Sequence, residues 1–140
     1  MGNTQSMQKI NFEDVQFVLK NADNYLLINT LSENEQKCLI PNTTAIEKEI
    51  DIINKCIQKR NKQVKIIIYG KNCNDEKIYQ KYNQLVGLGF YNIYIYTGGL
   101  FEWLMLQDIY GNTEFPTTEK EIDILIYKPI KLLNVQLIEY

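Results

Sequence analysis

The sequence predicts an α/β fold: a three-layer domain in which a parallel sheet has helices on both faces. Residues 66–69, Ile-Ile-Ile-Tyr, are apolar without alternation, as in a strand buried on both faces. After a short polar stretch, residues 75–88 have apolar side chains at helical spacing. The same order of strand and helix recurs along the chain, and such alternation is typical of parallel sheets.

The part of the chain before residue 64 predicts two helices and one strand. Asn11 can cap a helix that begins at Phe12 and breaks at residues 21–24. Residues 25–28, Tyr-Leu-Leu-Ile, form the next strand, and the polar residues 29–37 form a loop with a helical turn. Thr44 and Glu47 then form a capping box. The helix that follows carries an isoleucine stripe that we expect to be buried: Ile46, Ile50, Ile53 and Ile57.

The part after residue 88 predicts one more strand and two helices. Residues 93–96 read as a buried strand, and residues 97–99 turn the chain into a helix over 100–110. This helix is apolar almost all round, so we expect the domain to enclose it, with Trp103 in the core. Gly111 ends it. Thr118 and Glu121 form a second capping box for a short helix that stops at Pro129, and residues 130–140 either add an edge strand or clasp the domain.

Composition excludes several classes of protein. The 140 residues suit one domain, and the 15 Lys and Arg against 17 Asp and Glu give a net charge of −2, without the basic cluster of a nucleic-acid binder. No apolar run is long enough to span a bilayer, and no secretory leader is visible. Three widely spaced cysteines indicate neither a disulfide framework nor a zinc site, so we expect a cytoplasmic protein without metal or cofactor. There is no His, and Arg60 is the single Arg.

Residues 1–9 read as a flexible N-terminus with an acylation pattern. Gly2 follows Met1, and Ser6 occupies the place that myristoylation requires. Alternatively, the first residues were added by cloning and Met7 is the natural start. One myristoyl chain binds membranes only marginally, so acylation at Gly2 would give weak and reversible membrane attachment.

Short segments of the chain together resemble a rhodanese-like domain. They are residues 66–69 before a polar loop, 88–94 (Leu-Gly-Phe-Tyr-Asn-Ile-Tyr), 98–103 (Gly-Gly-Leu-Phe-Glu-Trp), and 27–31 (Leu-Ile-Asn-Thr-Leu) with Glu35. The resemblance covers roughly residues 10–110. We expect a rhodanese-like domain over residues 10–118, with residues 119–140 as a C-terminal helix and extension packed on it. The resemblance also implies a sulfurtransferase fold with a Cys-containing loop after the strand that ends at residue 69.

The chain departs from the family where the chemistry would be. A family sulfurtransferase has its nucleophilic Cys directly after this strand and an Arg five positions later, and this chain has Gly70 and Asp75 there. The family's Asp-x-Arg is replaced by Asn29 and Leu31. Cys73 lies three residues late in the loop, and Ile78 stands five positions after it, so the resemblance implies a degenerate active site.

Cys73 is the candidate nucleophile, although its neighbours disfavour a thiolate. A helix N-terminus and the cations Lys71 and Lys77 would favour one, but Asp75 and Glu76 already place negative charge there. We therefore favour a binding or regulatory module without turnover. The alternative is a thiosulfate-type sulfurtransferase that carries sulfur as a persulfide on Cys73.

A third hypothesis is binding of a small anion by the loop amides. Its candidate residues are Gly70, Lys71, Asn72, Asn74, Asp75 and Lys77. The partner is thus an unknown protein or a small anion.

Overall fold

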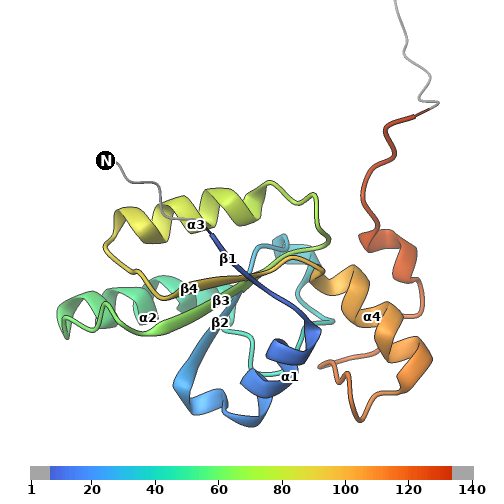
Figure 1. Cartoon of the computed structure of the whole chain (residues 1–140), viewed down its shortest axis with the longest axis horizontal. Helices are drawn as coiled ribbons and strands as arrows, with labels where there is room; N and C mark the ends of the chain where they lie inside the picture. Colours follow the sequence, from blue (N-terminus) through green and yellow to red (C-terminus); the bar gives the residue numbers. More distant parts are fainter. Residues whose placement is uncertain (1–6, 134–140) are drawn as a thin grey trace, which may run out of the picture.

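The computed structural model describes residues 7–133 and contains a four-stranded parallel sheet between two layers of helices (Figure 1). The strands are β1 (Gln8–Ile10), β2 (Tyr25–Asn29), β3 (Lys65–Tyr69) and β4 (Ile93–Tyr96), in the order β1-β4-β3-β2. Each neighbouring pair is parallel. The prediction of a three-layer parallel α/β domain is confirmed.

The strands bury both of their faces, and this gives two cores. The helices α2 (Ile46–Gln58) and α3 (Lys77–Gly87) cover one face, on which Ile66, Ile68 and Ile95 pack with Ile53 and Leu85. The helices α1 (Phe12–Lys20) and α4 (Gly99–Tyr110) cover the other face. Figure 1 shows α3 and α1 on opposite sides of the sheet. The second core contains Leu27, Ile67, Tyr69, Tyr96 and Trp103.

The sheet begins with a strand that the sequence did not predict. Gln8 and Lys9 of β1 pair with Tyr94 and Ile95 of β4, so these two residues are not part of a flexible N-terminus. Their side chains are exposed. A strand of three residues with a single apolar side chain is too short to show the alternation of apolar and polar residues that predicts a strand. Gly2 lies outside the described residues, and its acylation stays a prediction.

The prediction that the domain encloses α4 is wrong. Trp103 is fully buried as predicted, but Met105 is 45% exposed and Ile109 is 68% exposed. A helix that packs on one side of a sheet presents only one face to it, and no other element of the described chain covers the opposite face of α4 completely. Gly111 ends the helix, as predicted, with a φ of 102°.

Both predicted capping boxes are absent. The backbone N–H of Thr44 donates to the carbonyl of Leu27, which holds this residue along the edge of β2, and α2 begins after Ala45 without a side-chain cap. On α2, Ile53 is buried but Ile50 is 71% exposed, so the stripe is only partly buried.

The hydroxyl of Thr118 donates to the carbonyl of Lys37 rather than capping a helix. The segment that follows forms a single 3-10 turn, η3 (Ile124–Tyr127), and Pro129 lies directly after its C-cap. Most of the predicted extension over residues 130–140 lies outside the described residues. No helix between residues 7 and 133 combines the length and the apolar character needed to cross a membrane.

Replacing Trp103 by Ala tests whether the core around α4 carries the stability of the fold. The indole is fully buried, stacks edge-on against Tyr96 and Phe115, and donates a hydrogen bond to the carbonyl of Pro116. We expect Trp103→Ala to lower the free energy of unfolding by roughly 3 to 5 kcal/mol in urea denaturation. Met105→Ala on the exposed face of the same helix is the control, and a loss below about 1 kcal/mol for Trp103→Ala would contradict the prediction.

Candidate functional site

The loop over residues 70–76 connects β3 to α3 at the carboxyl edge of the sheet. It is joined to the start of α4, because the backbone N–H groups of Leu100 and Phe101 donate to the carbonyls of Gly70 and Lys71 at 2.9 and 2.8 Å. Gly99 has a φ of +68°, and a Cβ there would lie 2.8 Å from the backbone nitrogen of Asn72. Only glycine permits this close approach.

The carboxylate of Asp75 lies inside this loop and accepts three hydrogen bonds. One oxygen accepts from the hydroxyl of Thr30 at 2.9 Å and from the backbone N–H of Lys71 at 3.2 Å. The other accepts from the backbone N–H of Lys77 at 3.0 Å. A Cβ on Gly70 would lie 2.2 Å from the same carboxylate. Asp75 thus fills the space that a side chain at position 70 would need.

Thr30 was not among the residues predicted for the site. It follows β2 directly, and its backbone N–H donates to the carbonyl of Tyr69 at the end of β3. This places the hydroxyl beside the loop. The available signal was its position at the end of a parallel strand next to β3, where loop residues meet.

Cys73 lies on the outer side of the loop and is exposed. Its thiol makes one long contact, with the side-chain oxygen of Asn74 at 3.8 Å. The thiol borders an apolar hollow of about 390 Å³ whose wall includes Phe101, Met105 and Pro129. The surroundings of Cys73 are therefore partly apolar. Among the described residues, no Lys or Arg donates a hydrogen bond to its thiol.

Asn72 points inward, in contrast to its neighbours. It is 7% exposed, and its amide nitrogen donates to the carbonyl of Tyr127 at 2.8 Å. Its side-chain oxygen accepts from the backbone N–H of Asn74 at 2.9 Å. Asn72 thus braces the loop and joins it to the C-terminal segment.

The ammonium group of Lys71 pairs with the carboxylate of Glu35 at 2.7 Å. Partial burial raises the pKa of Glu35, but hydrogen bonds from Lys71 and Ser32 outweigh it and hold the pKa below its usual value. The charge of Lys71 is therefore already balanced by a carboxylate from the loop after β2.

The positions that resemble the family's Asp-x-Arg have packing roles. Asn29 is 3% exposed and exchanges two hydrogen bonds with the side-chain amide of Gln36. Its oxygen also accepts from the backbone N–H of Leu31, whose side chain is buried in the core beneath α1 and α4. Both residues thus make contacts within the chain.

The loop over residues 70–76 contains neither a metal-binding cluster nor an arginine. The described residues contain no cluster of three or more His, Cys, Asp or Glu that would hold a metal ion. Arg60 lies between α2 and β3, at the amino edge of the sheet, so the single Arg of the chain is on the opposite edge from Cys73. The groups that remain near the loop are a thiol, carboxylates and lysines.

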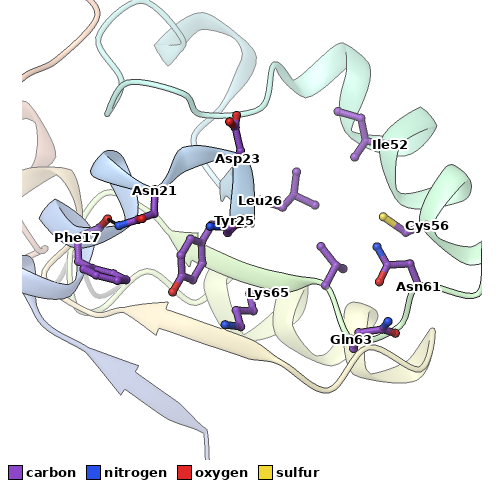
Figure 2. A pocket seen from close by; sticks show the side chains of 12 residues that line it. Phe17, Asn21, Asp23, Tyr25, Leu26, Ile52, Cys56, Asn61, Gln63 and Lys65 are labelled. Carbon is purple, nitrogen blue, oxygen red and sulfur yellow. Dashed lines mark hydrogen bonds between the residues drawn. The ribbon is translucent and has the colours of Figure 1, made fainter.

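A second hollow, of about 560 Å³, lies at this amino edge, where β2 and β3 begin. Figure 2 shows Phe17, Tyr25 and Lys65 on one side of it and Ile52 and Cys56 on the other. Cys56 is half-buried here. The residues of its wall come from several elements and form no sequence motif, so this hollow could not be predicted from the sequence.

The predicted loop residues Gly70, Lys71, Asn72, Cys73, Asn74 and Asp75 thus lie together, with Lys77 opening α3. Whether they bind an anion stays a prediction.

Comparisons with known proteins agree with the fold. The family model of the rhodanese-like domain matches residues 14–106. The solution structure of the rhodanese-like domain of the Alr3790 protein from Anabaena sp. is 20% identical, with a TM-score of 0.56, and the match covers 97% of this chain and 94% of that one. The single-domain sulfurtransferase RDL2 of Saccharomyces cerevisiae is 19% identical, with a TM-score of 0.51 over 74% of this chain and 94% of that one.

A thiosulfate sulfurtransferase from Pseudomonas aeruginosa is 13% identical with a TM-score of 0.56, and the match covers 71% of this chain but only 19% of that one. No curated protein matches the chain at a significant level. At these identities the solved structures support the fold alone.

A double-mutant cycle tests whether Asp75 fills the loop. We expect Gly70→Ala to cost about 1 to 3 kcal/mol of unfolding free energy, because the new methyl group displaces the carboxylate from its three donors. In an Asp75→Ala background the same change should cost at least about 1 kcal/mol less. Equal costs in the two backgrounds, measured in urea, would contradict the assignment.

The pH dependence of stability tests the Glu35 pair. A pKa lowered in the folded state gives stability that is complete above the ordinary value of 4.5 and is lost as the pH falls through the lowered value. Glu35→Gln should therefore destabilise the protein near pH 7, and its difference from the wild type should shrink below pH 4.5 in urea titrations. Glu33→Gln, an exposed carboxylate on the same turn, is the control. If the difference in unfolding free energy between Glu35→Gln and the wild type does not depend on pH, the Glu35–Lys71 pair does not stabilise the fold as predicted.

Proposed function

The chain belongs to the rhodanese-like domain family, and from this membership we propose that it acts as a binding or regulatory module without catalytic turnover. The family membership supplies a sulfurtransferase fold and a loop at the carboxyl edge of the sheet. The proposal concerns what this chain does with that loop.

The observation that carries the proposal is the position of the Asp75 carboxylate. The backbone N–H groups of Lys71 and Lys77, which point into the loop, donate to this carboxylate and not to a vacant site. An anionic substrate or a sulfur anion would have to replace a covalently attached anion that already has three donors. Because like charges at short range disfavour each other, a second anion beside Asp75 would also be repelled.

The surroundings of Cys73 support the same conclusion. Activation of a thiol requires a base or cations that lower its pKa. The nearby ammonium of Lys71 is paired with Glu35, and Arg60 lies at the opposite edge of the sheet. The chain has no His to act as a base. Lys77 is the other cation among the predicted loop residues, and among the described residues no hydrogen bond joins it to the thiol of Cys73.

The charges around the loop favour a protein partner over a small anion. A hollow of about 650 Å³ beside the loop is walled by Glu35, Lys71, Asp75 and Lys77, among other residues. Carboxylates and ammonium groups alternate in it, and no single sign prevails. A mixed surface of this kind suits the polar rim of a protein interface, in which both signs are matched.

An assay with thiosulfate and cyanide tests the absence of turnover. We expect no thiocyanate above the background of a protein-free sample, and we expect Cys73 to alkylate no faster than free cysteine near neutral pH. Cys73→Ser should leave the free energy of unfolding unchanged within about 0.5 kcal/mol, because an exposed thiol contributes little packing. Cys56→Ser is the control for loss of a thiol away from the loop.

Turnover that survives in Cys56→Ser and vanishes in Cys73→Ser would overturn the proposal in favour of a sulfurtransferase. A persulfide found on Cys73 by mass spectrometry after thiosulfate treatment, without thiocyanate, would instead support a sulfur carrier.

A further inference from the structure

The carboxyl edge of the sheet is crossed by a segment that lies beyond the family match. Residues 124–130, called the C-terminal strap here, follow the matched residues 14–106 and consist of η3 and the three residues after it. In Figure 1 the strap lies beside α4. Lys128 and Ile130 line the polar hollow next to the loop over 70–76, and Pro129 lines the apolar hollow next to Cys73. The strap therefore passes between the two hollows.

Two contacts hold Tyr127, the best buried residue of the strap, on the domain. The side-chain amide of Asn72 donates to the carbonyl of Tyr127 at 2.8 Å, and this amide is buried. The ring of Tyr127 is 3% exposed and packs in the same core as Leu100 and Trp103. Tyr127 is thus the one fully buried side chain of the strap, and its carbonyl meets the one buried side chain of the loop.

The chain on either side of Tyr127 is weakly held. Upstream, Leu125 is 62% exposed and Ile126 is 50% exposed, and downstream Ile130 is 90% exposed. The nearest firm attachment before the strap is Thr118, which exchanges hydrogen bonds with Leu39. Segments with few buried apolar contacts open at lower free energy than the core. The buried ring of Tyr127, the hydrogen bond from Asn72 and the partly buried side chain of Ile124 are therefore the attachments that hold the strap closed.

We propose that the strap is a releasable cover of the loop, and that it opens locally while the sheet remains folded. In parallel α/β proteins the crevice outside the carboxyl ends of the strands is where ligands bind. Here the strap occupies that crevice within the same chain and divides it into a polar hollow of about 650 Å³ and an apolar hollow of about 390 Å³. Withdrawal of Tyr127 joins the two hollows and uncovers the inner side of Asn72. The inference goes beyond the absence of turnover and does not depend on it.

Hydrogen–deuterium exchange on the 140-residue protein tests the proposal at the strap and at the loop. In the wild type, we expect amides of the strap, such as those of Ile126 and Lys128, to exchange at least about 100-fold faster than those of β3. Asn72→Asp removes the donor to Tyr127 but keeps the oxygen that accepts from Asn74. It should speed exchange in the strap at least about tenfold and leave β3 unchanged.

The reverse experiment uses Tyr127→Ala, which removes the buried ring from the strap. Because coupling between two sites is reciprocal, this change should speed exchange in the loop, at the amides of Asn74 and Asp75, by a similar factor. Tyr127→Phe is the matched control, since it keeps the ring and should leave both segments as in the wild type.

Strap amides that are as protected as those of β3 in the wild type would overturn the proposal, because the strap would then open only on global unfolding. Faster exchange in the strap of Tyr127→Ala without any change in the loop would also overturn it, because the strap would not cover the loop. If Tyr127→Ala unfolds the sheet, the test rests on Asn72→Asp alone. Strap amides that exchange at the wild-type rate in Asn72→Asp would then contradict the proposal. None of these outcomes depends on the thiocyanate assay.

Discussion

The carboxyl edge of this domain depends on one interaction, the partly buried carboxylate of Asp75 held by three donors inside the loop. The carboxylate draws the hydroxyl of Thr30 from the loop after β2 and the backbone N–H groups at both ends of its own loop. It requires Gly70, because any side chain there would overlap it. The backbone N–H groups of Lys71 and Lys77, which would otherwise be open to solvent or a ligand, thus have an acceptor within the chain.

The positions at which the sequence departs from the family pattern have contact partners within the chain. The positions that resemble the family's Asp-x-Arg are Asn29, which forms a buried amide pair with Gln36, and Leu31, which is buried in the core. The positions that would carry the Cys and the following Arg are Gly70 and Asp75. Each pair is consistent with the other members of its own contact network. The polar side chains Asn29 and Asp75 both have hydrogen-bond partners within the chain.

The sequence predicted the parallel sheet, the loop and the buried Trp103, because continuous apolar runs and helical spacing report burial directly. It did not predict β1, whose three residues pair only through their backbone at an edge. The capping boxes failed because Thr44 and Thr118 use their polar groups in contacts with residues distant in sequence, Leu27 and Lys37. The loop residues were identified, but the direction of Asp75 into the loop was not, since it depends on Thr30, which is 45 residues away.

The wrong prediction for α4 leads to the role of the C-terminal segment. A helix that is apolar almost all round has no face suited to water, yet the sheet covers only the side of Trp103 and Leu104. The remaining apolar side, with Met105 and Ile109, borders the hollow whose far wall is Pro129 of the strap. An apolar surface beside a weakly held segment of the same chain is partly covered when that segment is closed and more exposed when it opens. Pro129, which lies outside the residues of the family match, therefore borders the apolar side of α4, while Met105 and Ile109 on that side stay exposed.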